Sequence, residues 1–217
     1  HVDPVSKEEA KNIKNYYIWY LYQALLNSTQ NSLNAMKYRV VGKRGSNTQA
    51  QLKPFFEVDV QLNGTIVNLN PSLDDIQRAI NKAANAVLKC SKNLYRWDKK
   101  DSSVYELIAQ EKEIVKVIIY LTGSIQGAKN KVNDVLESFN KFEWLWSDSI
   151  IDSVKEFNKK TPTLTDYEEK LKKFEDAEEQ IEDIDVIFKI GAMALKTDNL
   201  KQGLKVWVKE WKAAYAE

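Results

Sequence analysis

The chain has 217 residues, a length that suits one domain or two small ones. Hydrophobic residues make up 43% of it and aromatic residues 11%, which is enough for a packed core and excludes a disordered or low-complexity chain. The charges almost cancel, with 32 basic against 31 acidic residues, so no overall field favours nucleic acid or an anionic membrane as a partner.

The N-terminal region, residues 1–41, predicts one long helix over residues 5–37. Ser6 is followed by Glu9 at the spacing of a capping box. Apolar residues then recur at helical spacing, namely Ile13, Tyr17, Tyr20, Leu21, Ala24 and Leu25. Aromatic side chains cover more than one face of this helix, namely Tyr16, Tyr17, Trp19, Tyr20 and Tyr22. We interpret them as core packing on two sides, with an aromatic ligand cage as the alternative.

Residues 42–54 predict a polar loop, because glycine, serine and asparagine break the helical pattern ahead of Pro54. A β-hairpin is predicted over residues 55–70, since Asn63-Gly64 lies between two apolar runs and both turn positions need a positive φ. The apolar residues of the two runs are Phe56, Val58, Val60 and Leu62, then Ile66, Val67 and Leu69. A hairpin alone is marginal in water, so we expect this one to pack on helices.

Ser72 predicts the start of the next helix, with Asp74 and Asp75 favourably placed in its first turn. Cys90 falls within this helical pattern and is the only cysteine. We interpret it as a small packed side chain rather than a reactive thiol. A single cysteine excludes a disulfide within the chain and favours a reducing compartment. The chain opens with His1 rather than Met and has no signal peptide, so we expect a piece of a longer protein.

The segment from residue 114 to 146 carries the most informative pattern. Apolar side chains alternate there at intervals of four and three, namely Ile114, Ile118, Leu121, Ile125, Ala128, Val132, Val135, Phe139, Phe142 and Trp146. This heptad seam predicts one helix from Val104 to Trp146, which Gly123 and Gly127 weaken by about 1 kcal/mol each without interrupting it. Such a helix is about 60 Å long, whereas a compact chain of this size is about 45 Å across. We therefore expect a rod-like bundle.

The rest of the chain predicts three shorter helices, over about 147–160, 165–184 and from 198 onward. Thr165 and Glu168 form a second capping-box pattern at the start of the middle one. Residues 185–196 are short and apolar, which indicates either a brief strand or a packed loop. The predicted fold class is mainly α: an elongated helical bundle with one long central helix and a small β-hairpin. Residues 55–217 are expected to form one continuous elongated domain.

The sequence lacks the residues on which most catalytic sites depend. His1 is the only histidine, which leaves no base for a Ser-His-Asp or Cys-His arrangement and too few ligands for a Cys/His zinc site. The di-iron Glu-x-x-His pairs are excluded for the same reason. Neither phosphate-binding glycine motif occurs. We predict no catalytic, cofactor-binding or metal-binding residue in this segment, and no cofactor.

Two charged features remain. Carboxylates crowd residues 175–185, namely Glu175, Asp176, Glu178, Glu179, Glu182, Asp183 and Asp185. A divalent-cation site is the sharper interpretation, and a solvated helix face is the one we favour. Lys201, Lys205 and Lys209 form a basic stripe at i, i+4 spacing on the last helix, opposite its apolar face. We predict that this stripe lies near the acidic stretch or meets an acidic partner.

Several strings resemble the tail of dynein heavy chains. Pro54-Phe-Phe-Glu-Val-Asp-Val-Gln-Leu62 through Asn70-Pro-Ser-Leu-Asp-Asp-Ile-Gln77 is similar to a hairpin-then-helix segment of that family. Ser91-Lys-Asn-Leu-Tyr-Arg-Trp97 resembles the axonemal, outer-arm branch, and Phe142-Glu-Trp-Leu-Trp146 resembles a sequence found further on. Leu200-Lys-Gln-Gly-Leu-Lys-Val-Trp-Val-Lys-Glu-Trp211 resembles the helix shortly before the linker of the motor. Order and rough spacing agree over about residues 50–217.

The resemblance implies a tail (stem) segment that precedes the linker of a microtubule-motor ATPase. The catalytic modules lie elsewhere in such proteins, so this segment is expected to connect the anchoring tail to the motor and to transmit force. Implied partners are the rest of the heavy chain and other heavy, intermediate or light chains, in the cytoplasm, cytoskeleton and ciliary axoneme. We expect neither nucleic acid nor membrane as a partner. Asn199 replaces a proline that is frequent in the family.

Two other classes stay open. A spectrin-like scaffold or adaptor bundle would bind partners, but plain three-helix repeats carry no internal hairpin such as the one predicted at residues 55–70. An enzyme or metal carrier would have to use the acidic stretch of residues 175–185.

Overall fold

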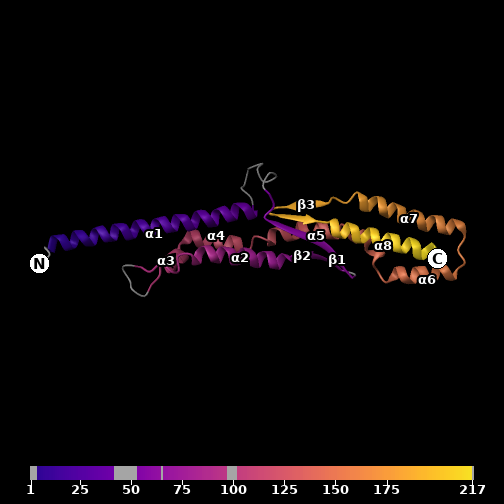
Figure 1. Cartoon of the computed structure of the whole chain (residues 1–217), viewed down its shortest axis with the longest axis horizontal. Helices are drawn as coiled ribbons and strands as arrows, with labels where there is room; N and C mark the ends of the chain where they lie inside the picture. The colour runs from indigo at the N-terminus through magenta and orange to yellow at the C-terminus, as the bar shows by residue number, and fades with distance from the viewer. Residues whose placement is uncertain (1–3, 42–52, 65, 97–101, 217) are drawn as a thin grey trace. The chain divides into compact units, whose positions relative to one another are not determined.

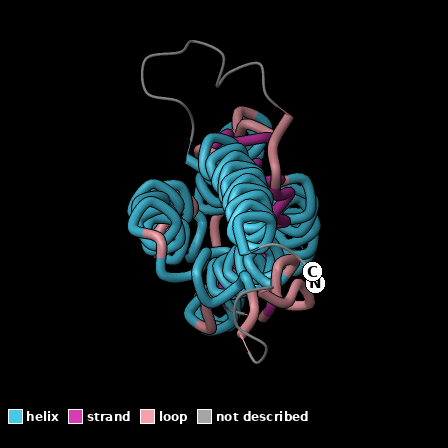
Figure 2. The backbone as a smooth tube through the Cα atoms, turned by 90° about the vertical axis from the view of Figure 1, so that its left-hand side faces the viewer, coloured by secondary structure: helices cyan, strands magenta, loops and turns pink. Residues whose placement is uncertain are grey.

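The computed structural model describes residues 4–41, 53–64, 66–96 and 102–216. Helices make up most of the described chain, as Figure 2 shows in cyan, so the mainly α class is confirmed. The chain forms two compact units, and each is built from two separate stretches of sequence. The first unit comprises His1–Ala50 and Gln77–Ile125, and the second comprises Gln51–Ile76 and Gln126–Glu217. The sequence instead predicted a division along the chain, with a loop at residues 42–54 between an N-terminal helix and the rest. That division stays a prediction.

The elements of the first unit are all helices over its described residues, joined by turns and one isolated β-bridge between Tyr95 and Ser103. It contains α1 (Pro4–Val41), most of α2 (Leu73–Lys89), α3 (Val104–Gln110) and α4 (Lys112–Thr122) (Figure 1). The long N-terminal helix is therefore confirmed, but Ser6 lies inside it rather than at its start. The second half of α1 packs on α4, where Leu33 and Val40 are buried and the Lys37 ammonium lies 4.5 Å from the centre of the Tyr120 ring.

Gln77 joins α2 to the end of α4. Its amide nitrogen donates to the carbonyl of Leu121 at 3.0 Å, and its amide oxygen accepts from the backbone N–H of Ile125 at 3.2 Å. The predicted cap of α2 is confirmed, because Ser72 Oγ accepts from the N–H of Asp75 at 3.2 Å. Cys90 corrects the sequence interpretation: its side chain is exposed instead of packed, beyond the last turn of α2.

The single helix predicted from Val104 to Trp146 is wrong. The segment divides into α3, α4, α5 (Gln126–Glu137) and a short 3₁₀ helix, η2 (Asn140–Leu145). The backbone becomes extended at Glu111, where ψ is 126°, which separates α3 from α4. Gly123 ends α4 and Ser138 follows α5. The length argument for a rod-like bundle therefore fails.

Local chemistry explains the breaks. The hydroxyl of Ser124 donates to the carbonyl of Leu121 at 2.8 Å, and that of Ser138 donates to the carbonyl of Val135 at 2.6 Å. Side-chain bonds of this kind replace the backbone bonds that would continue a helix. The burial pattern of the seam nevertheless holds. None of its side chains is exposed, and seven are buried: Ile114, Leu121, Ile125, Val132, Phe139, Phe142 and Trp146.

A four-stranded sheet lies in the second unit, in the order β2-β1-β4-β3. The predicted hairpin is confirmed as β1 (Phe56–Asn63) and β2 (Ile66–Asn70) around Gly64, whose φ is +63°. A second hairpin, β3 (Ile187–Ile190) and β4 (Met193–Lys196), extends it, so the strand alternative for residues 185–196 is correct. The inner strands β1 and β4 run parallel, and Figure 1 shows the two hairpins together.

Helices complete the second unit: α5, η2, α6 (Ser149–Lys159), α7 (Leu164–Glu182) and α8 (Asp198–Ala216). Helix α8 is central, since it contacts β1, η2, α6 and α7. The capping box of α7 is formed by Thr163 and Asp166 instead of Thr165 and Glu168, so α7 starts earlier than predicted. Residues 42–52 of the predicted loop lie outside the described residues. No helix in the described ranges is long and apolar enough to cross a membrane.

Candidate functional site

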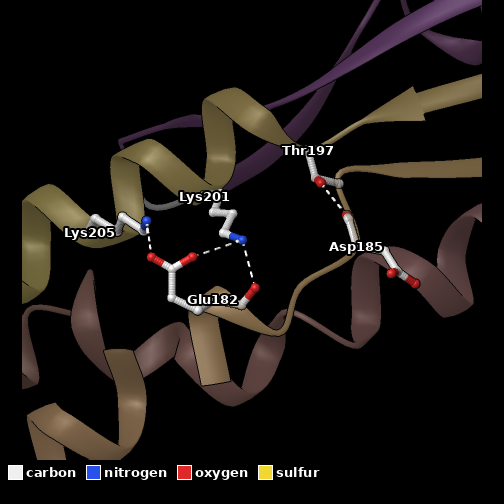
Figure 3. Close-up of polar contacts among 5 residues, drawn as sticks. All are labelled: Glu182, Asp185, Thr197, Lys201 and Lys205. Carbon is white, nitrogen blue, oxygen red and sulfur yellow. Dashed lines mark hydrogen bonds and ion pairs between the residues drawn. The ribbon is translucent and has the colours of Figure 1, made fainter. Parts of the chain in front are cut away.

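The predicted meeting of the acidic stretch and the basic stripe occurs at the end of α7, where it faces the start of α8 (Figure 3). The Nζ of Lys201 lies 3.2 Å from Oε2 of Glu182 and donates to the carbonyl of the same residue at 2.7 Å. Lys205 pairs with the other carboxylate oxygen of Glu182. Two of the three predicted lysines therefore converge on one carboxylate.

The electrostatics of this contact follow from its place on the helix. The carbonyl that receives Lys201 belongs to the last turn of α7, where cations are favoured by the helix dipole. The Lys201 side chain is only 14% exposed, while that of Glu182 is 59% exposed. Hydrogen bonds from Lys205 and then Lys201 lower the pKa of Glu182 below its ordinary value of 4.5, against the small opposing effect of burial.

Thr197 ties the connection after α7 to the start of α8. Its hydroxyl donates to the carbonyl of Asp185 at 2.6 Å, and its N–H donates to the carbonyl of Val186 at 3.0 Å (Figure 3). Thr197 is fully buried, so these bonds satisfy polar groups that water does not reach. They fix the turn between α7 and the second hairpin against the first turn of α8.

Two more ion pairs extend the junction. Lys212 on α8 pairs with Glu178 on α7 at 2.7 Å, and Lys196 on β4 pairs with Glu57 on β1 at 2.6 Å. Lys209 makes no ion pair with any residue that the structure describes. Over the same residues, no group of three or more histidine, cysteine or acidic side chains is placed to hold a metal ion. The arrangement joins α7 to α8 and β4 to β1.

Sequence reasoning missed an aromatic junction around α8. The indole N–H of Trp211 donates to the carbonyl of Leu145 at 2.7 Å, which joins α8 to η2. The hydroxyl of Tyr215 donates to Oγ of Ser153 on α6 at 2.9 Å. The ring of Tyr215 also contacts those of Phe157 and Phe174, with centroids 5.2 and 5.7 Å away. The tryptophan-rich strings of the sequence were the available signal.

The aromatic cluster of α1 is not a core, which corrects the two-sided packing predicted for it. Tyr16, Tyr17, Trp19 and Tyr20 are between 50% and 61% exposed. Only Tyr22 is anchored, through a short hydrogen bond to the carboxylate of Glu111. Partial burial and that bond raise the pKa of Tyr22 to about 12.

Comparison with known proteins bears on the resemblance. No family model matches the chain. It is 34% identical over 216 residues to the flagellar outer-arm dynein gamma chain of Chlamydomonas reinhardtii, covering 99% of this chain and 5% of that protein. The chain belongs to the dynein heavy chains. Dynein axonemal heavy chains 8 and 5 of Mus musculus are 25% and 24% identical to it over 95% of its length, and it spans 5% and 6% of them.

Three of the strings that resemble dynein heavy chains meet in the second unit. Pro54–Leu62 contains most of β1, Phe142–Trp146 contains the end of η2, and Leu200–Trp211 lies in α8. Helix α8 contacts both β1 and η2, and the bond from Trp211 to Leu145 joins the last two strings directly. These three strings are thus made of residues that pack together.

Proposed function

We propose that the chain is a non-catalytic stem segment of a dynein heavy chain, which connects the anchoring tail to the microtubule motor and transmits force between them. The observation that carries this proposal is the parallel pairing of β1 with β4. Four residue pairs join these strands, from Phe56↔Met193 to Asp59↔Lys196.

Parallel pairing suits a segment under tension. The chain enters β1 at its N-terminal end and leaves β4 at its C-terminal end into α8. A pull on these two ends drives the strands past each other, because paired parallel strands are then loaded from opposite ends. The hydrogen bonds between them bear the load together instead of breaking one after another. The ion pair of Lys196 with Glu57 joins the same two strands.

The contacts that α8 makes with α7, η2 and α6 would carry part of the same force. Because α8 continues from β4, a force that reaches α8 acts on every element bonded to it. Glu182 joins it to α7, Leu145 joins it to η2 and Ser153 joins it to α6. A load on α8 is thereby distributed over the helices of the second unit.

The rest of the proposal follows from family membership. We infer that the intact protein is a microtubule-motor ATPase of the ciliary axoneme and cytoskeleton, and that this segment itself holds no cofactor and no active site. Its partners would be the remainder of the same heavy chain and other heavy, intermediate or light chains. By their names, the relatives belong to axonemes and to the flagellar outer arm, which supports this assignment.

A spectrin-like scaffold is the alternative. Repeated three-helix bundles would place neither a mixed four-stranded sheet between helices nor two interleaved stretches of chain in one unit. Both features favour the dynein stem.

Single-molecule pulling tests the load-bearing geometry. One handle is fixed at the C-terminal end, and the other at either Lys53→Cys or Asn63→Cys, both in a Cys90→Ser background. Lys53 and Asn63 are exposed; Lys53 precedes β1 and Asn63 is its last residue. A handle at residue 53 pulls β1 and β4 from opposite ends, while one at residue 63 peels them apart from the same end. We expect a severalfold higher unfolding force from residue 53.

The two handle variants serve as controls for each other, because they load the same folded unit. Equal unfolding stabilities in urea would show that neither cysteine damages the fold. Equal unfolding forces for the two attachment points would contradict a load-bearing role for the β1–β4 pair.

A further inference from the structure

A cavity of about 120 Å³ lies within the second unit, and side chains from η2, α6, α7 and α8 line it. Two lysines of α7, Lys170 and Lys173, contribute ammonium groups to its wall, and two serines of α6, Ser149 and Ser153, contribute hydroxyls. None of the described residues that line it is acidic. The wall therefore carries positive charge without a negative charge of its own.

The two lysines lack a counter-ion. Neither forms an ion pair with any residue in the ranges that the structure describes. The Nζ of Lys173 lies 4.2 Å from the centre of the Trp144 ring, and that of Lys170 lies 5.7 Å from the centre of the Tyr215 ring. Both rings also line the cavity. They hold the ammonium groups in place but do not neutralise them, because an aromatic ring carries a quadrupole and no net charge.

The nearest carboxylates along α7 line a different cavity. Asp166 and Glu169 precede Lys170 and Lys173 by one turn, and they line a neighbouring cavity that shares both lysines. Asp166 is already engaged, because its carboxylate accepts from the hydroxyl and the N–H of Thr163 at 2.6 and 2.8 Å. These two bonds lower the pKa of Asp166. The cavity at Ser153 thus keeps an excess of positive charge.

Ser153 adds a neutral donor to the same wall. Its Oγ accepts from the hydroxyl of Tyr215 at 2.9 Å, and it donates to no acceptor in the part of the chain that the structure describes. A serine hydroxyl can donate one hydrogen bond while it accepts others. Its own proton is therefore available to a ligand in the cavity, whereas the hydroxyl of Ser149 donates to Ser147 at 3.0 Å.

We propose that this cavity binds a phosphoryl group, either as inorganic phosphate or as a phosphate monoester. Such a group carries a charge of about −1.5 to −2 at pH 7 and three strong acceptor oxygens. That charge and those oxygens match two ammonium groups and one free hydroxyl, whereas a carboxylate brings only one charge and two oxygens. One water takes up about 30 Å³ in the liquid, so the cavity has room for a group of several heavy atoms. This inference does not depend on the force-bearing role.

Titration of the whole chain with small anions tests the proposal. Inorganic phosphate, O-phospho-L-serine and acetate are added at low ionic strength, and the indole N–H signals of the tryptophans are followed by NMR. The Trp144 signal should move, because the anion draws Lys173 from its ring, while that of Trp19 in the first unit should stay. We expect a dissociation constant of about 1 mM for phosphate, from two charge-assisted hydrogen bonds, and severalfold weaker binding of acetate. Tighter binding of phosphoserine than of phosphate would identify an ester as the ligand, and the reverse would identify free phosphate.

Substitutions on α7 locate the site. Lys170→Gln and Lys173→Gln should each weaken phosphate binding by at least about tenfold. Lys173→Arg should retain binding, because it keeps the charge. Lys172→Gln is the matched control, since Lys172 is exposed on the same helix and does not line the cavity. It should leave the affinity unchanged.

Three results would overturn the proposal. The first is a Trp144 signal that does not saturate with phosphate or phosphoserine. The second is acetate binding as tight as that of phosphate, which would show general attraction of anions instead of a phosphoryl site. The third is an equal loss of affinity in Lys172→Gln and Lys173→Gln, which would show that the charge of α7 as a whole is responsible.

Discussion

Glu182 is a negative charge at the end of a helix where the dipole favours positive ones. Lys201 offsets this unfavourable charge in two ways: its ammonium pairs with the carboxylate of Glu182 and donates to the carbonyl of the same residue. Lys205 completes the pairing of the second carboxylate oxygen. Glu182 thus becomes the point at which α7 is attached to α8.

Glu182→Gln tests this attachment through its pH dependence. The pKa of Glu182 is lower in the folded chain than its ordinary value of 4.5. Its charge therefore stabilises the fold above pH 4.5, and that contribution is lost as the pH falls through the folded pKa. We expect a small decrease in melting temperature for the variant at pH 7, and convergence with the unmodified chain in acid. Thermal unfolding at a series of pH values measures both.

Glu179→Gln is the matched control, since Glu179 is exposed on the same helix and its carboxylate forms no ion pair within the described ranges. It should leave the melting temperature unchanged at pH 7. A decrease at pH 7 that is equal for both variants would show that general helix charge, and not the pairing with α8, is responsible.

Local residue chemistry was predictable where one pattern had one solution. The first hairpin forms where Asn63-Gly64 predicted it, but Asn63 is the last residue of β1, paired with Ile66, and of the two predicted turn positions only Gly64 has a positive φ. Ser72 capped α2 through its contact with Asp75, as predicted. The start of α7 was not unique. Thr163 and Thr165 each precede an acidic residue by three positions, and the structure uses the earlier pair. Both choices make the same bonds, so the sequence could not distinguish them.

At the scale of elements, the heptad seam predicted burial correctly and continuity wrongly. Apolar spacing of four and three residues indicates which side chains face inward. A short turn that keeps the same spacing leaves those side chains buried although the helix ends. The helix breaks at Glu111, where the backbone is extended, and near Ser124 and Ser138, whose hydroxyls bond to backbone carbonyls. These are local features that a pattern of apolar spacing does not report. The low helix propensity of Gly123 predicted only a weakened helix, whereas α4 ends at this residue.

The sequence left strand β4 undecided between a strand and a packed loop, for a different reason. Met193, Ala194 and Leu195 are all buried, so the strand shows no alternation. An apolar run this short fits a buried strand or a packed loop equally well. Its parallel partner β1 is distant in sequence, and pairing at such separation leaves no local signal.

Two glycines give an element-scale prediction with opposite signs. Gly203 lies inside α8, and a methyl group added there would meet no atom within 4 Å. Gly203→Ala should stabilise the chain by about 1 kcal/mol through helix propensity. Gly64→Ala has equal space but a φ of +63°, so it should destabilise by about 1–2 kcal/mol. Urea unfolding measures both. Stabilisation by Gly64→Ala would show that the turn is not held in that conformation.

At the scale of the whole molecule, the second unit closes over an interruption in the chain. Its first stretch, Gln51–Ile76, supplies β1, and its second, Gln126–Glu217, supplies β4 and α8. The first unit is also built from two stretches. Neither unit can form from one uninterrupted piece of sequence. Two of the strings that resemble dynein heavy chains, Pro54–Leu62 and Leu200–Trp211, lie in β1 and α8, which pack together across that interruption. The periodicity of the sequence could not reveal this contact.

The interleaved order predicts how the chain loses structure. Leu195 on β4 is fully buried and lies opposite Val58 of β1. Leu195→Ala should destabilise the second unit by about 2–5 kcal/mol, because it removes buried apolar volume. We expect amide exchange to accelerate together in residues 51–76 and 126–217, and much less in residues 77–125. Leu33→Ala is the matched control, since Leu33 is equally buried in the first unit. It should accelerate exchange in residues 77–125 instead. If Leu195→Ala left residues 51–76 protected, the two stretches would not fold as one cooperative unit.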